Sequence, residues 1–341
     1  MLKVSIYGIG DFGFALLKHL SEKADKGQFS VCAYDKNKKL RDFLRKEKKH
    51  PIHYKNIKIN KSIIIEKTPK NLIKGADVLI LAITSNAISC VIKKIKPYIN
   101  KKIIILNTAK AIDPHSGERP SAIICNHLKD LKHPFSVAML AGGTIAKDLF
   151  NKEPLGADIA CKDKKVLKTL KNILISKNLN LYETTDLAGV EYAAALKNAI
   201  SILSGIMRGL KFSHGSETYI ISRAANEAKE LVINKLGGKE KTFSIGSQCW
   251  GNDMWMSATG NTRNRKFGIL LGQGYTTKEA LATMQKRNKT VEGVNTIKAV
   301  KKIIKNNKNA VPILYNLNKI ISNSGKNAKK IILDLVSSNK I

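Results

Sequence analysis

The sequence lacks any long uninterrupted apolar run. In 341 residues no stretch approaches the roughly 18 apolar residues that a membrane-spanning helix needs. The N-terminus also lacks the pattern of a secretory signal, because Gly8 and Gly10 interrupt its first apolar run. We therefore expect a cytoplasmic protein with no membrane span, and the apolar share of 43% is typical of a folded globular chain.

Cysteine is scarce, and no CxxC pair or histidine at ligand spacing accompanies it. The five cysteines are scattered along the chain, at Cys32, Cys90, Cys125, Cys161 and Cys249. An odd and dispersed set argues against a disulfide framework and a zinc site. We expect reduced thiols and no metal.

Acidic residues are few, since 26 Asp and Glu stand against 60 Lys and Arg, and the formal net charge is +34. Such an excess invites an interpretation as a nucleic-acid or membrane-surface binder. Aromatic residues that would stack on bases make up only 6% of the chain and are rare among the lysines, even in the denser patches at 36–49 and 301–308. Ile and Asn are abundant along with Lys, so a coding bias explains the charge better, and we expect no specific nucleic-acid partner.

The chain opens with a strand-like run, a glycine-rich turn and a helix-like run. Leu2–Tyr7 leads into Gly8-Ile9-Gly10-Asp11-Phe12-Gly13. In a dinucleotide site the first glycine permits a tight turn, the second lets the backbone approach a pyrophosphate, and the third lets the helix pack on the strand. The helix N-terminus then directs N–H groups at the phosphates. The alternative is a sharp strand-to-helix turn that holds no ligand.

Asp35 and Lys36 stand where a dinucleotide site recognises the cofactor's ribose, at the end of the second expected strand. Asp35 would accept hydrogen bonds from the ribose hydroxyls of NAD, whereas Lys36 would meet the 2′-phosphate of NADP. The two residues favour different cofactors. We expect NAD or NADP, with NAD preferred, and a turn with solvated charges is the alternative.

The first half of the chain alternates strand and helix patterns, which predicts a parallel sheet covered on both faces. The expected strands are 2–7, 30–34, 62–65, 77–83, 102–107, 135–140, 157–161 and 179–182. After Tyr182 only helical patterns remain, at 187–210, 217–236, 263–271, 278–285, 295–305, 311–321 and 327–336. We predict a doubly wound Rossmann-type α/β domain over 1–184 and an all-helical substrate and catalytic domain over 185–341.

Lys197 is one of only two charged residues between Val190 and Met207, the other being Glu191. It shares a helical face with apolar residues, so we expect it to be at least partly buried. Burial lowers the pKa of a lysine, and such an amine can exchange protons near neutral pH. The alternative is a lysine that extends to solvent or pairs with Asp186 or Glu191.

A basic stretch, Gly260-Asn261-Thr262-Arg263-Asn264-Arg265-Lys266, precedes an apolar helix. Thr262 has the character of an N-cap residue. A helix N-terminus that carries Arg263 and Asn264 is suited to binding a phosphate, because it offers guanidinium and amide donors.

The chain resembles the NAD(P)-dependent glycerol-3-phosphate dehydrogenases of the bacterial type over nearly its whole length. Six motifs in order carry the resemblance: 8–13, Asn107-Thr108-Ala109-Lys110, 140–146, Gly189-Val190-Glu191 with Ala195-Leu196-Lys197-Asn198, 262–268 with Leu271-Gly272-Gln273-Gly274, and Val291-Glu292-Gly293. The resemblance implies that Lys197 is the proton acceptor, and that Lys110 helps bind both cofactor and substrate.

The resemblance completes the expected sites. The expected catalytic residues are Lys197, Lys110 and Asp253. The expected cofactor contacts are Gly8, Gly10, Asp11, Phe12, Gly13, Asp35, Lys36, Lys110, Ala146, Arg263 and Glu292. The expected substrate contacts are Lys110, Gly142, Thr144, Lys197, Asn198, Asp253, Thr262, Arg263 and Asn264.

The sequence departs from the family pattern in two places. The family's Gly-Pro-Ser is Gly142-Gly143-Thr144 here, which loses a rigid turn but keeps a hydroxyl. Around 247–254 an ungapped count from Arg263 puts Asn252 at the family's acidic position, whereas matching Asp-Met-Trp-Met-Ser selects Asp253. We prefer Asp253. Trp250 and Trp255 lie beside it, and core packing explains both better than a role in narrowing the site.

The resemblance implies a dehydrogenase that interconverts sn-glycerol 3-phosphate and dihydroxyacetone phosphate and so supplies glycerophospholipid synthesis. We expect a small phosphorylated substrate and a homodimer. Two alternatives remain open: a related two-domain hydroxyacid or ketopantoate dehydrogenase, and an inactive basic protein that binds nucleic acid or membrane surfaces.

Overall fold

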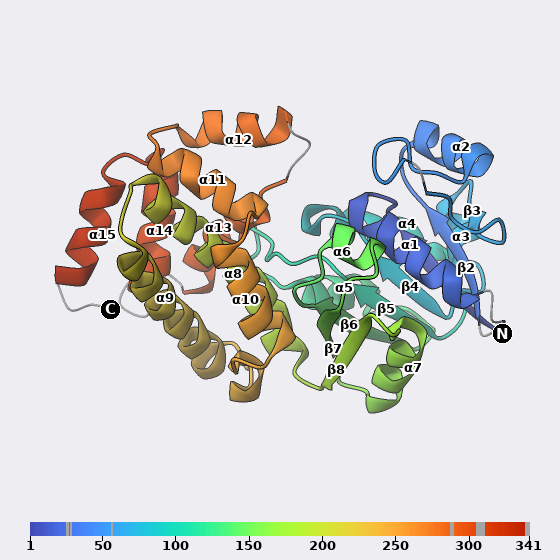
Figure 1. Cartoon of the computed structure of the whole chain (residues 1–341). Coiled ribbons are helices and arrows are strands. Elements are labelled where there is room, and N and C mark those ends of the chain that lie inside the picture. The colour runs from blue at the N-terminus through green and yellow to red at the C-terminus, as the bar shows by residue number, and fades with distance from the viewer. Residues whose placement is uncertain (25–26, 28, 56, 287–289, 305–310, 338–341) are drawn as a thin grey trace. The chain divides into compact units, whose positions relative to one another are not determined.

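The structure is a computed structural model that describes residues 1–24, 27, 29–55, 57–286, 290–304 and 311–337. Residues 305–308 of the predicted basic patch lie outside the described residues. The chain divides into two compact units (Figure 1): unit 1 comprises residues 1–109 and 120–187, and unit 2 comprises residues 110–119 and 188–341. The short segment 110–119, which begins with Lys110, therefore belongs to unit 2 although it follows a strand of unit 1.

Unit 1 alternates strands and helices. Its strands are β1 (Leu2–Tyr7), β2 (Phe29–Tyr34), β3 (Ile64–Ile65), β4 (Val78–Leu81), β5 (Ile103–Asn107), β6 (Phe135–Ala141), β7 (Leu155–Ala160) and β8 (Leu179–Thr184). Its helices are α1 (Asp11–Ala24), α2 (Lys38–Glu47), α3 (Pro69–Ile73), α4 (Ile88–Ile95), α5 (Pro120–Leu128), α6 (Ala146–Phe150) and α7 (Lys164–Leu174), with 3-10 turns at η1 (Ser85–Ala87) and η2 (Lys96–Tyr98).

The strands form one eight-stranded sheet with the order β3-β2-β1-β4-β5-β6-β7-β8. The first six positions reproduce the doubly wound dinucleotide-binding order, in which the chain reverses direction across the sheet next to β1. The predicted Rossmann-type fold is confirmed. One detail differs, because β7 pairs antiparallel with β6 although we expected parallel strands throughout. The connection between them holds only the five-residue α6, which is shorter than the helix of an ordinary parallel crossover.

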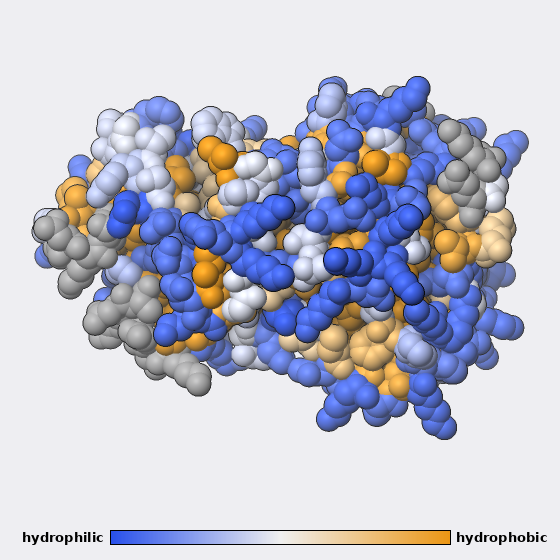
Figure 2. All heavy atoms as spheres, turned by 90° about the horizontal axis from the view of Figure 1, so that it is seen from below, coloured by the Kyte–Doolittle hydropathy of each residue, from blue (hydrophilic) through white to orange (hydrophobic). Residues whose placement is uncertain are grey.

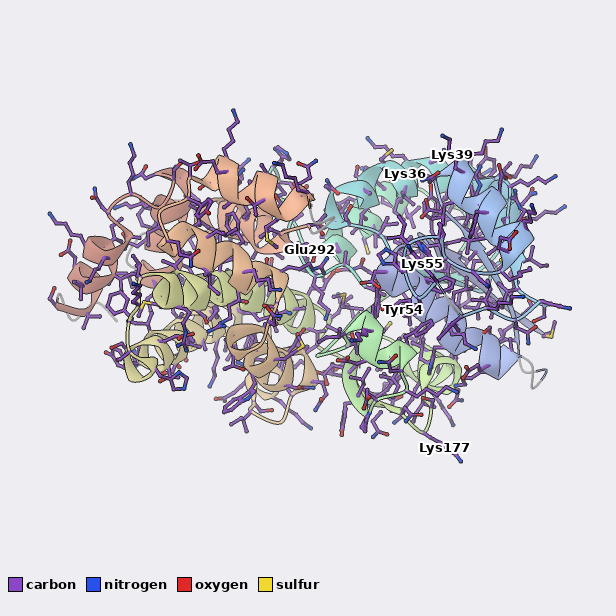
Figure 3. The ribbon with its side chains drawn as sticks, turned by 45° about the horizontal axis from the view of Figure 1, so that its top comes forward. Lys36, Lys39, Tyr54, Lys55, Lys177 and Glu292 are labelled. Atoms are coloured by element: carbon purple, nitrogen blue, oxygen red, sulfur yellow. The ribbon has the colours of Figure 1, made fainter. Side chains whose placement is uncertain are left out.

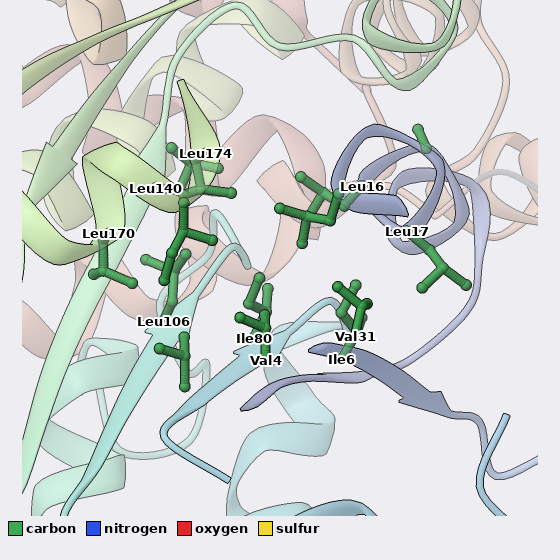
Figure 4. Packing of buried hydrophobic residues seen from close by; sticks show 14 of the residues in the cluster. Val4, Ile6, Leu16, Leu17, Val31, Ile80, Leu106, Leu140, Leu170 and Leu174 are labelled. Atoms are coloured by element: carbon green, nitrogen blue, oxygen red, sulfur yellow. The ribbon is translucent and has the colours of Figure 1, made fainter. Parts of the chain in front are cut away.

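Two apolar layers cover the sheet, one on each face. Alternate residues of β1 point to opposite layers, as the two-residue period of a strand requires. Val4 and Ile6 pack with α1, α6 and α7, as the close view in Figure 4 shows for the leucines of α1 and α7. Tyr7 packs with α3, α4 and α5 on the other face. The glycine-rich turn thus leaves the sheet from a strand that is buried on both sides.

Unit 2 contains helices and connecting turns and, within its described residues, no strand. Its helices are α8 (Leu187–Gly209, whose first residue lies in unit 1), α9 (His214–Lys235), α10 (Asp253–Thr259), α11 (Arg263–Gly272), α12 (Thr277–Lys286), α13 (Glu292–Ile303), α14 (Pro312–Ser322) and α15 (Ala328–Ser337), with short turns at η3 (Glu240–Phe243) and η4 (Gln248–Asn252). The all-helical prediction is confirmed, and α10 is the helix that we did not predict. Within the described part of the chain, no helix is both long enough and apolar enough to cross a membrane.

Helix α8 is buried on every side from Gly189 to Met207. It crosses α11 closely, because glycines on both helices let the two backbones touch. A Cβ atom built on Gly205 would lie 2.1 Å from the carbonyl oxygen of Arg265, and one built on Gly268 would lie 2.1 Å from that of Ile202. The same holds one turn on, where Gly209 and Gly272 meet. This crossing fixes α11, with Arg263 and Asn264 at its start, against the helix that carries Lys197.

We predict that Gly268→Ala lowers the free energy of unfolding by about 2–3 kcal/mol, because the added methyl forces the two backbones apart. Gly215→Ala in α9 is the matched control, since its Cβ would meet nothing within 4 Å. That variant should be neutral or stabilising by about 0.5 kcal/mol. Urea unfolding measures both, and equal stabilities for the two variants would contradict the close crossing.

Candidate functional site

The glycine-rich turn of unit 1 is fixed by hydrogen bonds within the protein. The N–H of Gly8 donates to the Tyr34 carbonyl at 2.8 Å, and the N–H of Ile9 donates to Oδ2 of Asp35 at 2.8 Å. The N–H of Phe14 donates to the Gly10 carbonyl at 2.8 Å, next to the start of α1. The turn is therefore already shaped by the chain's own groups.

The three glycines of the turn differ in whether the protein leaves room for a side chain. Gly8 has φ of +100°, and its Cβ would lie 2.4 Å from the Ala82 carbonyl oxygen. A Cβ on Gly13 would lie 2.1 Å from the Gly8 carbonyl oxygen. A Cβ on Gly10 would meet nothing within 4 Å, so no atom of the protein requires a glycine there. Open space at Gly10 beside the N-terminus of α1 fits a bound pyrophosphate, which needs that close approach.

Asp35 is half-buried at the end of β2, and Lys36 is exposed next to it. The Asp35 carboxylate accepts from Ile9 N–H through Oδ2 and from Asn37 N–H through Oδ1. Each carboxylate oxygen has a second lone pair, so Asp35 keeps acceptor capacity for a ribose hydroxyl. Lys36 and Lys39, labelled in Figure 3, offer exposed ammonium groups at the start of α2.

The remaining expected cofactor contacts fall in both units. In unit 1 the Asp11 carboxylate accepts from the Tyr54 hydroxyl at 2.8 Å, Phe12 is half-buried, and Ala146 is buried at the start of α6. In unit 2 Arg263 and Glu292 are the first residues of α11 and α13. Of the expected substrate contacts, Gly142 and Thr144 follow β6 in unit 1, where Gly142 is buried and Thr144 is half-buried.

Lys197 lies at the centre of a charged group within unit 2. Its side-chain nitrogen is 2.8 Å from Oδ1 of Asp253, and the second oxygen of that carboxylate is 3.1 Å from Nζ of Lys110. Lys197 is 5% exposed and Asp253 is fully buried. One carboxylate therefore holds two ammonium groups, and Lys197 does not pair with Asp186 or Glu191. Glu191 instead binds Arg119, at 2.8 Å.

Burial lowers the pKa of Lys197 below the usual value for lysine, Asp253 opposes this shift, and the nearby Lys110 adds to it. Ser257, one turn after Asp253 on α10, accepts a hydrogen bond from Lys197 at 2.8 Å. We did not predict a role for Ser257, although its spacing of four residues from Asp253 puts both on one face of a helix. Lys197 thus donates to two acceptors on the same helix.

A chain of amide groups links Lys110 to the starts of α11 and α13. Nδ2 of Asn198 donates to the Lys110 carbonyl at 3.0 Å, and its Oδ1 accepts from Nδ2 of Asn264 at 2.9 Å. Oδ1 of Asn264 accepts from the N–H of Gly293 at 3.1 Å. These partners fix the orientation of both amides, and they leave Asn264 with one further N–H donor.

Thr262 occupies the N-cap position of α11, but its side chain makes no capping hydrogen bond. The predicted N-cap position is confirmed, and the hydroxyl donates to the Ser257 carbonyl at 3.0 Å, which links α10 to α11. Arg263 is exposed, and its guanidinium lies 3.3 Å from the Thr290 hydroxyl. Arg265 faces inward and pairs with the buried Glu217 at 3.0 Å. Of the two arginines, Arg263 is the one accessible to an anion.

The structure separates the two candidates for the acidic position. Asp253 is buried against both lysines, whereas Asn252 is exposed and its amide donates to Gln248. Trp250 is buried and packs edge-on against Phe243, with ring centroids 4.9 Å apart, as expected for core packing. Trp255 is 72% exposed, so core packing does not explain it.

Comparison with known proteins covers nearly the whole chain. The pattern described as the NAD-dependent glycerol-3-phosphate dehydrogenase N-terminus matches residues 3–167, and the corresponding C-terminus pattern matches residues 186–332. A "Glycerol-3-phosphate dehydrogenase [NAD(P)+]" from Fusobacterium nucleatum subsp. nucleatum is 30% identical over 340 residues, which is 100% of this chain and 98% of that protein.

Solved structures share the fold. The glycerol-3-phosphate dehydrogenase structure from Coxiella burnetii has a TM-score of 0.85 and 24% identity and covers 98% of each chain. The Plasmodium falciparum glycerol-3-phosphate dehydrogenase structure has a TM-score of 0.88 and 21% identity, covering 100% of this chain and 96% of that one.

Asp253→Asn should lower the free energy of unfolding by about 3 kcal/mol at neutral pH, because it leaves a buried ammonium without its carboxylate. The same change in a Lys197→Met background should cost at least about 1 kcal/mol less, since that ammonium is then absent. Urea unfolding of the four proteins in this double-mutant cycle measures the coupling. Strictly additive effects would show that the two groups do not interact.

Proposed function

The chain belongs to the NAD-dependent glycerol-3-phosphate dehydrogenase family, and on that basis we propose that Lys197 exchanges the substrate proton in its reaction. The protein is an NAD(P)-dependent oxidoreductase that interconverts sn-glycerol 3-phosphate and dihydroxyacetone phosphate. The observation that carries the role of Lys197 is its buried ammonium, 2.8 Å from a carboxylate that also holds Lys110.

The reaction moves a hydride and a proton. The hydride at C2 of the substrate would be supplied or accepted by NAD(P) when it is bound. In the reducing direction the ammonium of Lys197 would donate a proton to the C2 oxygen, where negative charge would develop. In the oxidising direction the neutral amine of Lys197 would take the proton of the C2 hydroxyl and become an ammonium.

Asp253 and Lys110 influence the protonation state of Lys197. Asp253 favours the charged form of Lys197, while burial and Lys110 favour the neutral form. These opposing influences keep the amine able both to give and to take a proton. Asn198 holds the Lys110 carbonyl, so we assign it a part in positioning Lys110.

The phosphate of the substrate would bind at the start of α11. Arg263 offers two parallel N–H donors. Asn264 offers the second N–H of its amide, which is not used in the hydrogen bond to Asn198. The N-terminus of α11 adds its positive dipole end. Thr262 would fix this turn rather than bind the phosphate through a capping hydroxyl.

On the cofactor side, Gly8, Gly10 and Gly13 with the start of α1 would hold the pyrophosphate, and Asp35 would accept from the ribose. Asp35 supports NAD and the exposed Lys36 supports NADP. We propose NAD as the preferred cofactor, because the Asp35 carboxylate is fixed by Ile9 and Asn37 whereas Lys36 is exposed to solvent.

The two alternatives are not favoured, because both halves of the chain match the glycerol-3-phosphate dehydrogenase family. We propose that the product serves glycerophospholipid synthesis and that the protein is cytoplasmic. Within the described part of the chain no disulfide joins the cysteines, which suits a reducing compartment. We also propose a homodimer, since Trp255 and Ile245 are 72% and 89% exposed and an interface would cover such apolar side chains. Analytical ultracentrifugation tests this state.

Lys197→Ala should reduce the rate of dihydroxyacetone phosphate reduction by about 10²–10⁴-fold, the usual range for losing a general acid. The dissociation constant for NADH should stay within about twofold, because the expected pyrophosphate and ribose contacts lie in unit 1. Oxidation of NADH and of NADPH, each with dihydroxyacetone phosphate, pyruvate or ketopantoate, measures activity, cofactor preference and substrate class in one panel. A near-normal rate in the variant would disprove the role of Lys197.

The pH dependence of the wild-type reaction rates should reflect the protonation state of Lys197. Reduction needs protonated Lys197, so its rate should fall as pH rises through the lowered pKa of this lysine, and oxidation should rise over the same interval.

Arg263→Ala should raise the Michaelis constant for dihydroxyacetone phosphate by about 10–100-fold, since a charge-assisted contact contributes about 1.5–3 kcal/mol. Its thermal stability should hardly change, because Arg263 is exposed. Arg265→Ala is the matched control and should lose stability, because it removes one of the two arginines that pair with the buried Glu217, the other being Arg208. An unchanged Michaelis constant in the Arg263 variant would overturn the phosphate role.

A further inference from the structure

His50 is a buried histidine of unit 1, between α2 and β3, for which the reaction itself has no use. The residue is 3% exposed. Nε2 lies 3.0 Å from the carbonyl oxygen of Ile9, in the middle of the glycine-rich turn. Nδ1 accepts from the N–H groups of Ile52 at 3.1 Å and His53 at 3.0 Å. The ring therefore connects a neighbouring turn of the chain to the dinucleotide loop.

The hydrogen-bond partners define the protonation of the ring. Because two backbone N–H groups point at Nδ1, that nitrogen carries a lone pair, and the proton resides on Nε2 and is donated to the Ile9 carbonyl. Burial lowers the pKa of His50 to about 4, with the nearby His53 adding to the effect. The ring is therefore neutral at neutral pH, the state that these contacts need.

The contact to Ile9 fixes a peptide plane. The carbonyl of Ile9 and the N–H of Gly10 belong to one trans peptide, so they point in opposite directions. Because His50 holds the carbonyl, the N–H of Gly10 is directed away from the ring. Asp35 holds the N–H of Ile9 and so fixes the preceding peptide. Two successive peptides of the loop are thus held by side chains from two different segments.

The segment that carries His50 has a second attachment to the same loop. The Tyr54 hydroxyl donates to Oδ1 of Asp11, the first residue of α1, at 2.8 Å. Its ring stacks on Phe150 of α6, with centroids 3.9 Å apart and an interplanar angle of 12°, and Figure 3 labels its position. His50 and Tyr54 therefore bracket the loop on both sides of Gly10.

We propose that His50 is a positioning residue for the cofactor, which holds the Ile9–Gly10 peptide in the orientation that a bound dinucleotide pyrophosphate requires. This inference rests on the proposed use of NAD(P). Because the loop is ordered before binding, the cofactor avoids the cost of ordering it. Loss of His50 should therefore weaken cofactor binding and leave the proton exchange on Lys197 unaffected.

The decisive variant is His50→Leu, which fills a similar volume without a donor. The dissociation constant for NADH, from fluorescence titration, should rise about tenfold, as expected when a buried carbonyl loses its partner. The Michaelis constant for NADH should rise with it, while kcat at saturating NADH stays within about twofold. Without cofactor, the amides of 10–12 should exchange with deuterium faster than in the wild type.

Two further variants separate positioning from general stability. His50→Gln keeps an amide donor at the place of Nε2, so it should restore the NADH dissociation constant to within about threefold of the wild type. His19→Leu is the matched control, because His19 also contacts a backbone carbonyl, that of Leu174 at 2.6 Å, elsewhere in unit 1. It should lower the melting temperature and leave NADH binding unchanged.

The outcomes distinguish this inference from the function on which it rests. Wild-type protein that fails to bind NADH would refute the proposed function. Wild-type protein that binds NADH, together with folded His50→Leu protein that binds it equally well, would refute only the role of His50. Equal weakening by His50→Leu and His19→Leu would also refute it, since the effect would then follow from stability alone.

Discussion

The burial of one ammonium group governs the architecture of unit 2. Lys197 sits on α8, a helix enclosed on all sides, where an unpaired charge would cost several kcal/mol. A carboxylate and a hydroxyl must therefore reach it, and α10 brings both through Asp253 and Ser257. The glycine crossing of α8 and α11 adds the second requirement, because it brings Asn264 within hydrogen-bond distance of Asn198. Segments far apart in sequence thus meet around one nitrogen atom.

The two units hold their functional groups in place by different kinds of interaction. In unit 1 the dinucleotide loop is held by backbone groups, a carboxylate and a neutral histidine ring, so its shape depends little on pH near neutrality. In unit 2 the central contacts are between charged groups, and a lysine that exchanges protons must keep a balance between burial and its neighbours. The loop that binds an anion needs a fixed backbone, whereas the lysine that exchanges protons needs a pKa set by opposing influences. The chain meets these two requirements with different residue types.

The sequence allowed the fold to be predicted because its patterns are local. Strand periods, the glycine turn and the helical patterns after Tyr182 each depend on neighbouring residues, and the eight-stranded sheet and the helical unit follow from them. The antiparallel β7 and the helix α10 were not predictable in this way. The first depends on how a short connection packs, and α10 is short and rich in large side chains, with Trp255 facing solvent.

The contacts of the candidate site were predictable only in part. The scarcity of charge around Lys197 revealed its burial, but its partner lies 56 positions away and no local pattern points to Asp253. The family motif led to Asp253, and the structure then revealed Ser257. His50 gives no signal in sequence, since its role depends on the meeting of two loops. Thr262 was recognisable as the N-cap of α11, but the direction of its hydroxyl was not, because a residue at this position can donate to another acceptor.

The excess of basic residues does not disturb the candidate site, because the acidic residues that pair with its lysines and with nearby arginines are buried. The chain has 60 Lys and Arg against 26 Asp and Glu, yet Asp253, Glu191 and Glu217 are all buried, and each pairs with a lysine or arginine. Exposed lysines interact weakly in water, so many can accumulate at little cost to the fold. Figure 2 shows hydrophilic residues spread widely over the face it presents. A coding bias toward lysine can therefore change the surface while the buried carboxylates, which hold the site together, stay in place.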